Sequence, residues 1–271
     1  TFYEKTAKLN NGDDSEFRNV FEIGTEVSFK AYSTWTDDDG FVWRHVIEPY
    51  ADLKLVPEAS VLPNELYQFD SIDEIEEEKS LLLGLRNRWQ YKTKGQNALT
   101  RELLYLDLYA VLNLDTEGDE DFFESLNFDL RFRPTSWMRL DGEGVYEQED
   151  TDVSEALFRL NVWYDVFEAS AFYRYLNDDD SNLAGGVITW NINPEWAISL
   201  YGRYEFENTH LEEIGTWIQR RFDCIAYRIY LTYEPSYIRY DGTEEDDDFR
   251  ISFVLWLTDF EPNHLRELND R

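Results

Sequence analysis

An alternation of apolar and polar residues with a period of two runs through most of the sequence. Between residues 104 and 114 one set of positions is almost all leucine: Leu104, Leu106, Leu108, Ala110, Leu112 and Leu114. The other set holds Tyr105, Asp107, Tyr109, Val111 and Asn113. Side chains on a β-strand point to opposite faces in turn, so such a segment has one apolar face and one more polar face. A helix would mix the two sets, because it has 3.6 residues per turn.

The same pattern predicts thirteen long strands, which makes the chain all-β. We place them at Glu16–Ser33, Trp43–Pro57, Lys79–Lys94, Thr100–Leu114, Phe122–Arg133, Ser136–Gln148, Glu155–Tyr164, Val166–Leu176, Asn182–Asn191, Glu195–Glu207, Glu212–Phe222, Asp223–Glu234 and Phe249–Asp259. A fourteenth, shorter segment of this kind lies near Phe2–Leu9. Long, even strands that follow one another are typical of an antiparallel up-and-down β-barrel.

The connections between these strands alternate in character. Tight ones are expected at 134–135, 164–165, 193–194 and 222–223. Longer, acidic ones are expected at 37–40, 115–121, 147–152, 178–180 and 244–248, and the longest runs from Glu58 to Glu78. Short turns at one end of the strands and longer polar loops at the other are typical of transmembrane barrels. We therefore predict a transmembrane barrel, with the loop from Glu58 to Glu78 on the long-loop side.

The charges divide between the two faces in a way that bears on the membrane. A soluble barrel fills its interior with apolar side chains, whereas a membrane barrel turns them outward and keeps polar groups in the lumen. We expect an outward, lipid-facing set of Leu106, Leu108, Leu126, Phe128, Leu130, Ile198 and Leu200. The lumen-facing candidates are Arg86, Arg88, Asp129, Arg131, Arg133, Arg139, Arg159, Arg174 and Arg203. The pattern alone does not say which of the two faces points outward. The number of strands and the Tyr and Trp residues at strand ends favour the membrane arrangement, with the apolar face outward.

Composition excludes several other classes. The 25 Lys+Arg and 57 Asp+Glu give a net charge of −32, which argues against a nucleic-acid partner. Aromatic residues make up 17% of the chain, which is too many for a disordered acidic segment. A single cysteine, Cys224, allows no internal disulfide or cysteine metal cluster. We expect no membrane-spanning helix and see no signal peptide at Thr1–Lys5.

Motifs of catalysis are missing from the sequence. The three histidines, His45, His210 and His264, are far apart, and no nucleophile, metalloprotease or phosphate-loop pattern occurs. We therefore predict no enzyme activity, no catalytic residue, no cofactor and no metal ligand. The acidic segments 37–40 and 115–121 contain the oxygen ligands that Ca²⁺ prefers, but solvated loops that protect strand edges explain them better. The arginines of the polar face are expected to pair with carboxylates across strands, or else to contact phosphates of a glycolipid.

Several segments, in their order, resemble one known family. Residues 44–50 read Arg-His-Val-Ile-Glu-Pro-Tyr, a loop then ends in Tyr-Gln-Phe-Asp-Ser-Ile-Asp at 67–73, and the next strand reads Leu-Gly-Leu-Arg-Asn-Arg-Trp-Gln at 83–90. Further on, Asn-Pro-Glu-Trp at 193–196 leads to Tyr-Gly-Arg-Tyr at 201–204, and Arg-Phe-Asp-Cys-Ile-Ala-Tyr-Arg spans 221–228. Together they resemble the LPS-assembly outer-membrane protein family LptD. The resemblance covers most of the chain and corresponds to the second half of the family's barrel.

The resemblance implies a function and partners. It implies an outer-membrane conduit in a Gram-negative-type bacterium that inserts lipopolysaccharide through a polar lumen and a lateral seam. The barrel would occupy residues 1–260, followed by a short tail at 261–271, and the seam strand would carry Phe249, Ile251, Phe253, Leu255 and Leu257. The implied partners are lipopolysaccharide, outer-membrane lipid, a plug lipoprotein and periplasmic bridge proteins. In a longer chain, Cys224 would pair with a cysteine outside this segment.

Two other functions remain open at this point. A passive porin would share the alternation and the polar lumen but would close as a complete barrel without a seam. A soluble, acidic, carbohydrate-binding β protein would bury the leucines and expose its Tyr and Trp to sugars. The position of the leucine set distinguishes the membrane proteins from the soluble one.

Overall fold

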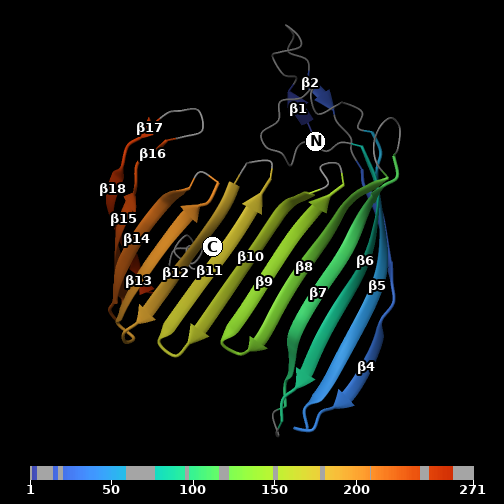
Figure 1. Cartoon of the computed structure of the whole chain (residues 1–271), viewed down its shortest axis with the longest axis horizontal. Coiled ribbons are helices and arrows are strands. Elements are labelled where there is room, and N and C mark those ends of the chain that lie inside the picture. The colour runs from blue at the N-terminus through green and yellow to red at the C-terminus, as the bar shows by residue number, and fades with distance from the viewer. Residues whose placement is uncertain are drawn as a thin grey trace.

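The computed structural model describes residues 2–4, 15–17, 21–58, 77–94, 98–115, 122–148, 152–177, 181–207, 209–238 and 244–258. Fourteen strands form one antiparallel sheet in the order β18-β15-β14-β13-β12-β11-β10-β9-β8-β7-β6-β5-β3, with β4 also paired to β5 (Figure 1). Their bounds are β3 Ile23–Ser28, β4 Ala31–Thr36, β5 Val42–Val56, β6 Glu78–Lys92, β7 Thr100–Asn113, β8 Phe123–Thr135, β9 Met138–Glu147, β10 Asp152–Tyr164, β11 Phe167–Leu176, β12 Ser181–Asn191, β13 Trp196–Glu205, β14 His210–Arg221, β15 Ile225–Glu234 and β18 Asp248–Leu257. The predicted all-β, up-and-down antiparallel arrangement is confirmed.

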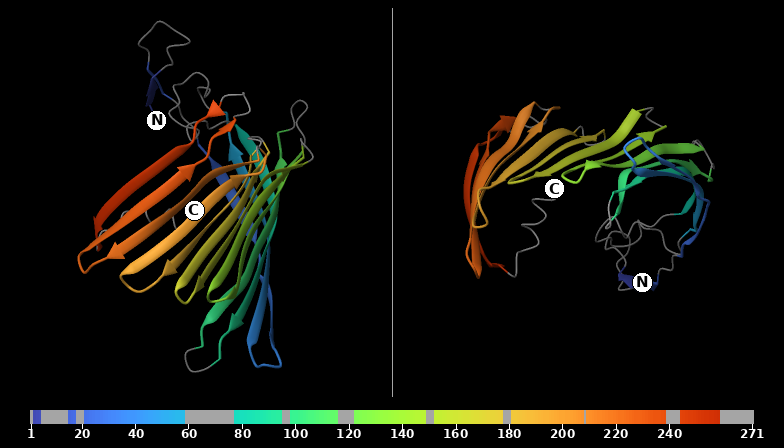
Figure 2. Two further views of the ribbon diagram at one scale, coloured as in Figure 1. Left: turned by 60° about the vertical axis from the view of Figure 1, so that its left-hand side comes forward. Right: turned by 90° about the horizontal axis from the view of Figure 1, so that it is seen from below.

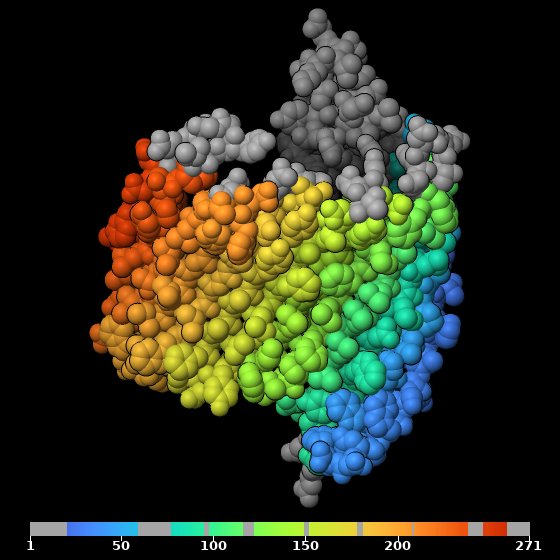
Figure 3. Space-filling view, viewed as in Figure 1, coloured from blue at the N-terminus to red at the C-terminus, as the bar shows by residue number. Residues whose placement is uncertain are grey.

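The sheet curls about the strand direction but does not close on itself. Seen from below, the sheet forms an open arc (Figure 2). Figure 3 looks onto its broad convex side. Among the described residues, β18 pairs with β15 and no other strand, while β3 and β4 both pair with β5 at the opposite edge. The curvature is that of a barrel wall, and within the described residues the two ends of the sheet are free edges.

The first predicted strand, Glu16–Ser33, is wrong in its extent. The sheet begins instead at Ile23, and its first strand is interrupted at Phe29 and Lys30 before continuing as β4. Both pieces keep one register on β5, since Ser28 lies opposite Tyr50 and Ala31 opposite Ile47. Pro49 of β5 stands opposite the gap, and a proline has no N–H to donate to the ladder. The interruption therefore follows from the sequence of the neighbouring strand.

Two small two-stranded sheets lie outside the large one. β1 (Phe2–Glu4) pairs with β2 (Ser15–Phe17), and β16 (Tyr237–Ile238) pairs with β17 (Glu244–Glu245) in the connection between β15 and β18. The predicted strand Phe2–Leu9 is confirmed for Phe2–Glu4, its remaining residues lie outside the described ones, and β1 does not pair with β18 in the described part of the chain.

Short connections gather at one end of the sheet. Residues 136–137, 165–166, 192–195 and 222–224 join strands there, within about two residues of the predicted turns. Asp165 has a φ of 55°, as the favoured two-residue hairpin turns use at their first central position. The acidic turn 37–40 lies at this same end, because it connects the end of β4 to the start of β5 there. Our assignment of that turn to the long-loop side is therefore wrong.

Other predicted features fall on residues that the structure does not describe. Most of the loop from Glu58 to Glu78, nearly all of the acidic segment 115–121, His264 and the tail 261–271 lie outside the described residues. The division into a barrel at 1–260 and a tail at 261–271 consequently stays a prediction.

Candidate functional site

The two faces of the sheet differ in chemistry and in crowding. Cross-strand registers place Glu48, Arg86, Asp107 and Asp129 in one row on the same face, while the neighbouring leucines point to the other. Glycines apart, all the buried residues of the described sheet, polar and apolar, lie on this polar face. A concave face brings its side chains together and a convex face spreads them apart. The polar face therefore lines the inside of the curved sheet, and we call it the concave face.

An arginine at the β3 edge holds together a network of carboxylates. Arg86 donates two hydrogen bonds to Glu26, at 3.1 and 3.0 Å, and a third to Asp107 at 3.3 Å. Its guanidinium also lies 3.8 Å from the Tyr50 ring centre and 3.8 Å from a carboxylate oxygen of Glu48. Because Glu26 is on β3 and Arg86 on β6, the network crosses β5 and ties the edge strand to the sheet.

Tyr50 crosses a strand in the same region. Its ring lies over Gly84 of β6, and its hydroxyl donates to Asp107 of β7 at 3.2 Å. Tyr201 does the same over Gly215, with its hydroxyl 2.7 Å from Thr232 of β15. In both cases a glycine removes the side chain that would stand in the way, so that one ring stabilises three adjacent strands.

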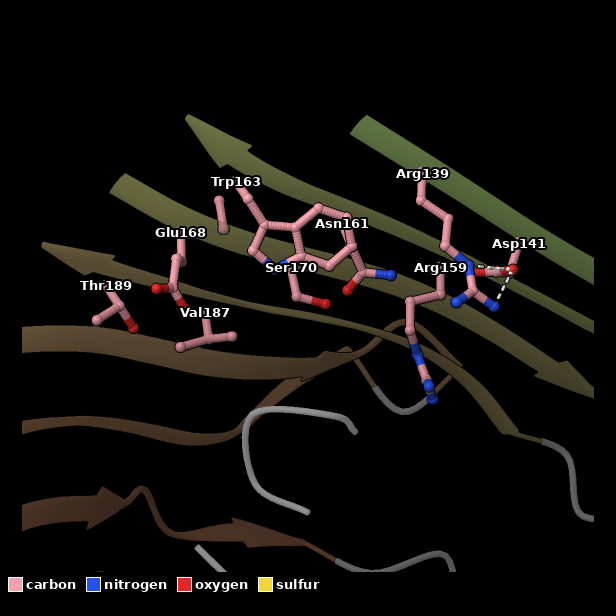
Figure 4. A pocket seen from close by; sticks show the side chains of 10 residues that line it. Arg139, Asp141, Arg159, Asn161, Trp163, Glu168, Ser170, Val187 and Thr189 are labelled. Carbon is pink, nitrogen blue, oxygen red and sulfur yellow. Dashed lines mark hydrogen bonds and ion pairs between the residues drawn. The ribbon is translucent and has the colours of Figure 1, made fainter. Parts of the chain in front are cut away.

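Three adjoining hollows occupy the middle of the concave face, and all of them include Arg159. The first, about 450 Å³, lies over β9 to β12 and contains Trp163, Asn161 and Glu168 (Figure 4). The second, about 270 Å³, extends it toward Asp129 and Arg131 on β8. The third, about 650 Å³, extends it toward Arg174, Arg203 and the rings of β13 to β15. We call this continuous depression the central trough.

Polar groups in the central trough are partly engaged with one another. Arg139 donates to Asp141 at 2.7 Å, as the dashed lines of Figure 4 show. Arg203 lies 3.5 Å from carboxylate oxygens of both Glu212 and Glu213. Arg131 places its guanidinium 4.2 Å from the centre of the Tyr105 ring, instead of against a carboxylate that the structure describes. Arg203 therefore pairs with a carboxylate across strands, whereas Arg139 pairs within its own strand.

The predicted site residues fall on two opposite faces. Eight of them, Arg86, Arg88, Asp129, Arg131, Arg139, Arg159, Arg174 and Arg203, are on the concave face by register, and Arg133 continues the same alternation at the exposed end of β8. The seam candidates Phe249, Ile251, Phe253, Leu255 and Leu257 are on the convex face of β18, and each is more than half exposed.

Sequence reasoning missed the aromatic members of the concave face. Trp163 is 48% exposed there although its neighbours in the hollow are polar, and Trp217 is buried beneath the guanidinium of Arg228 at 4.1 Å. A signal was available for Trp163, because it shares the alternating set of Arg159 and Asn161 rather than that of Leu160 and Val162. Trp217 carries no such signal, since its burial depends on the curvature of the sheet.

The convex face is apolar in the middle and aromatic near the tight turns. Its central rows consist of aliphatic residues and small ones, such as Ala169, Ile188, Leu200 and Thr216, which lie opposite one another on successive strands. Large exposed rings follow at the tight-turn end: Trp35, Trp137, Tyr164, Phe167, Trp190 and Phe222. Several of them contact each other, for example Trp137 with Tyr164 at 5.5 Å between ring centres. A belt of rings beside an apolar band is typical of a surface at a membrane interface.

The described residues contain no group of three or more His, Cys, Asp or Glu side chains placed to hold a metal ion. Within the same residues, no helix is long and apolar enough to cross a membrane. Cys224 is a free, exposed cysteine at the turn between β14 and β15.

A comparison with protein families gives a match over much of the chain. The family model described as LptD: LPS transport system D matches residues 2–196, which is more than half of the 271 residues of the chain. The match includes β3 to β12 and most of the central trough. No curated protein shows a significant match.

Proposed function

This chain belongs to the LPS transport system D family, and from that premise we propose that its sheet is part of the wall of a lipopolysaccharide-conducting outer-membrane barrel. Membership makes the chain an outer-membrane β protein related to lipopolysaccharide transport. In the proposal, the concave face lines an aqueous passage for the saccharide part of lipopolysaccharide, and the convex face contacts lipid. In this proposal lipopolysaccharide is transported without making or breaking a covalent bond, so the chain needs no catalytic residue, cofactor or metal.

The observation that carries this proposal is the division of the sheet into two faces. Arginines and carboxylates such as Arg86, Asp107 and Arg159 gather on the concave face, while Ile188, Leu200 and their neighbours cover the convex one. A soluble β protein has the opposite requirement, because its apolar side chains must meet inside. Exposed aliphatic side chains in the middle of the convex face support a lipid-facing surface.

We also propose that the acyl chains leave the barrel sideways at the edge formed by β18. Its convex face carries Phe249, Ile251, Phe253, Leu255 and Leu257, which are between 54% and 65% exposed. An unpaired strand edge in lipid costs several kcal/mol for each unsatisfied group, so this edge needs a partner strand. A weakly paired partner would open and let a lipid leave sideways. The plug lipoprotein and the periplasmic bridge proteins enter the proposal from the family alone.

Photo-cross-linking in cells tests the passage and the exit together. A photoreactive amino acid is placed at Asn161 on the concave face, at Ile251 on the convex face of β18, and at Ile188 on the convex face far from that edge. We expect lipopolysaccharide adducts at Asn161, and more of them at Ile251 than at Ile188, while transport is active. De-energised cells supply the control, since adducts at Asn161 should then decrease.

A passive porin gives a different result in the same experiment. Lipopolysaccharide would be absent from Asn161, and Ile251 and Ile188 would capture it equally as ordinary lipid-facing positions. That outcome would contradict the proposed conduit.

A further inference from the structure

The convex face of the sheet is hollowed in its middle, over β10 to β14. The hollow has a volume of about 410 Å³. Its floor is a row of small residues that stand opposite one another on neighbouring strands, Ala171, Gly186 and Gly202. The same row continues into Leu160 on β10 and Ile214 on β14, which form its two walls. The hollow therefore results from three adjacent positions without a large side chain, and we call it the convex groove.

A groove on a lipid-facing surface is filled by the apolar phase around it. Atoms that line a void lose their dispersion contacts on one side, and other atoms that enter the space restore these contacts. Water is not available in the core of a bilayer, so it does not fill the groove there. The aliphatic walls and the small residues of the floor offer no partner to a polar group. A flexible, apolar acyl chain has the chemistry that matches this groove.

An arginine lies on the same face, further along β14 toward the tight turns. Arg220 stands directly opposite Trp196 of β13 and is partly exposed. Its guanidinium carbon is 4.8 Å from the centre of the Trp196 ring and 4.6 Å from the centre of the Phe222 ring. Within the described residues it is not paired with a carboxylate. The two rings hold the cation by cation–π contact, and the forked geometry of its N–H groups suits phosphate oxygens.

The distance between the convex groove and Arg220 matches half of a bilayer. Ile214 and Arg220 are six positions apart on β14, which is about 20 Å of extended strand. Membrane strands are tilted by about 35–45°, so this length corresponds to about 14–16 Å of depth. Half of a hydrocarbon core is about 15 Å thick. A groove at the midplane of the bilayer therefore places Arg220 at the level of the phosphate groups.

The charge of the whole chain makes this position distinctive. With a net charge of −32, the protein as a whole repels anionic headgroups. A phosphate at Arg220 is therefore held by the local cation and by an acyl chain in the groove, and the overall field opposes it. The two contacts belong to one ligand, because a phospholipid has a phosphate at one end and acyl chains that extend toward the midplane.

We propose that the convex groove and Arg220 form a binding site for one phospholipid, with its phosphate at Arg220 and an acyl chain in the groove. The inference rests on the proposed function, because a lipid reaches this face only if the face lies in the membrane. The bound lipid belongs to the leaflet on the tight-turn side, and it fixes the ends of β13 and β14 at the level of the phosphate groups.

Native mass spectrometry of the full chain in detergent tests the site with two lipids. Dioleoyl phosphatidylglycerol is compared with dioleoylglycerol, which has the same acyl chains and no phosphate. We expect the chain to retain one molecule of phosphatidylglycerol. Its affinity should be about tenfold higher than that of dioleoylglycerol, the effect of one charge-assisted hydrogen bond.

Three variants separate the contributions of the charge and the groove. Arg220→Gln should lower the affinity for phosphatidylglycerol to that for dioleoylglycerol. Arg220→Lys should keep the preference, because it keeps the charge, and it thereby distinguishes a lost charge from a lost fold. Ala171→Leu should fill the groove and weaken the binding of both lipids. Ala171 is exposed, so the larger side chain has room without disturbing the sheet.

Two further variants serve as matched controls. Arg101→Gln removes an arginine from the convex side of β7 at the same end of the sheet, where leucines follow it instead of small residues. Ala110→Leu adds the same side chain to the convex face of β7, outside the groove. Both should bind the lipids like the unchanged chain. Equal affinity for the two lipids, no retained lipid, or equal losses in the controls would overturn the site.

The outcomes also separate the site from the proposed function. Phospholipid binding that behaves as expected, together with failed cross-linking at Asn161, would contradict the conduit and leave the site in place. Cross-linking at Asn161 without phospholipid binding would contradict the site and leave the conduit in place.

Discussion

Single residues of the concave face act across several strands at once. Arg86 joins Glu26, Asp107 and Tyr50, which come from three different strands, and Tyr50 reaches Asp107 only because Gly84 stands between them. Substitutions in this network are expected to lower the free energy of unfolding, because they leave a partly buried charge unpaired or create a clash. Their effects can be measured one at a time.

Arg86→Met is expected to destabilise the chain by about 1–3 kcal/mol, because Asp107 loses the cation beside it while staying buried. Urea unfolding in vesicles provides the measurement. Arg133→Met is the matched control, since Arg133 is exposed at the end of β8. Equal midpoints for the two variants would show that the network does not stabilise the sheet.

Gly84→Ala is expected to cost about 1–3 kcal/mol, the range for overpacking, since the new methyl group would overlap the Tyr50 ring and break its bond to Asp107. Gly24→Ala is the control, because its nearest neighbour would be the Leu53 carbonyl oxygen at 3.6 Å. The same urea titration applies, and a loss in Gly24→Ala as large as that in Gly84→Ala would contradict the explanation.

At the scale of elements, each hairpin joins a tight turn to strands whose convex side is apolar. The β4–β5 turn is held by Asp37, whose carboxylate accepts hydrogen bonds from the Phe41 amide and the Trp43 indole, both at 2.8 Å. Mid-strand positions such as Leu200 on β13 instead depend on what surrounds the convex face. Asp37 therefore serves to test the turn, and Leu200 serves to test whether lipid surrounds the convex face.

The β4–β5 turn should loosen in acid. The hydrogen bond from Trp43 above all, with the Phe41 and Gly40 amides, lowers the pKa of Asp37 below its ordinary value of 3.8. A lowered pKa adds stability that is complete above 3.8 and disappears as the pH falls through the value in the folded turn. The indole N–H resonance of Trp43 should shift over that acidic range. Asp37→Ala should abolish the shift, and a shift that survives this substitution would exclude Asp37 as its source.

Leu200→Arg is expected to cost roughly 2–4 kcal/mol in a bilayer, the range for a cation near the midplane on the lipid face of a strand. Leu200 is 54% exposed in the middle of β13. Phe206→Arg, on the same side just beyond the end of β13, should cost about 0–1 kcal/mol. Urea unfolding in liposomes gives both values, and equal costs would contradict a membrane around the convex face.

For the whole molecule, the question is whether the curved sheet closes. In the described part of the chain β18 has one paired and one free edge, and its amides must alternate between them. Thr258 donates its N–H to the Cys224 carbonyl oxygen, so the N–H of Ser252 also points toward β15 and that of Phe253 toward the free edge. An open sheet and a closed barrel therefore respond differently to proline.

Phe253→Pro should leave the stability of the chain almost unchanged, whereas Ser252→Pro should remove a ladder hydrogen bond and lower the unfolding midpoint strongly. Thermal unfolding of the chain in vesicles compares the two variants. If both lower the midpoint equally, the second edge of β18 is paired, as in a closed porin.

The sequence by itself determined the strands, their up-and-down order and the division of residues between two faces. These properties are local, because they depend on a period of two and on turn residues at strand ends. The family followed from short segments such as 44–50 and 83–90, whose order is visible without any structure.

Only the tertiary structure decided which residues meet. The contacts of Arg86 with Glu26 and of Tyr50 with Asp107 cross an intervening strand, so they depend on register and on a glycine at the crossing point. The interruption at Phe29 and Lys30 depends on Pro49, twenty positions away from Phe29 along the chain. The central trough depends on curvature, which brings Trp163 and Arg174 to one hollowed surface. Curvature and register belong to the assembled sheet, because no single strand possesses them.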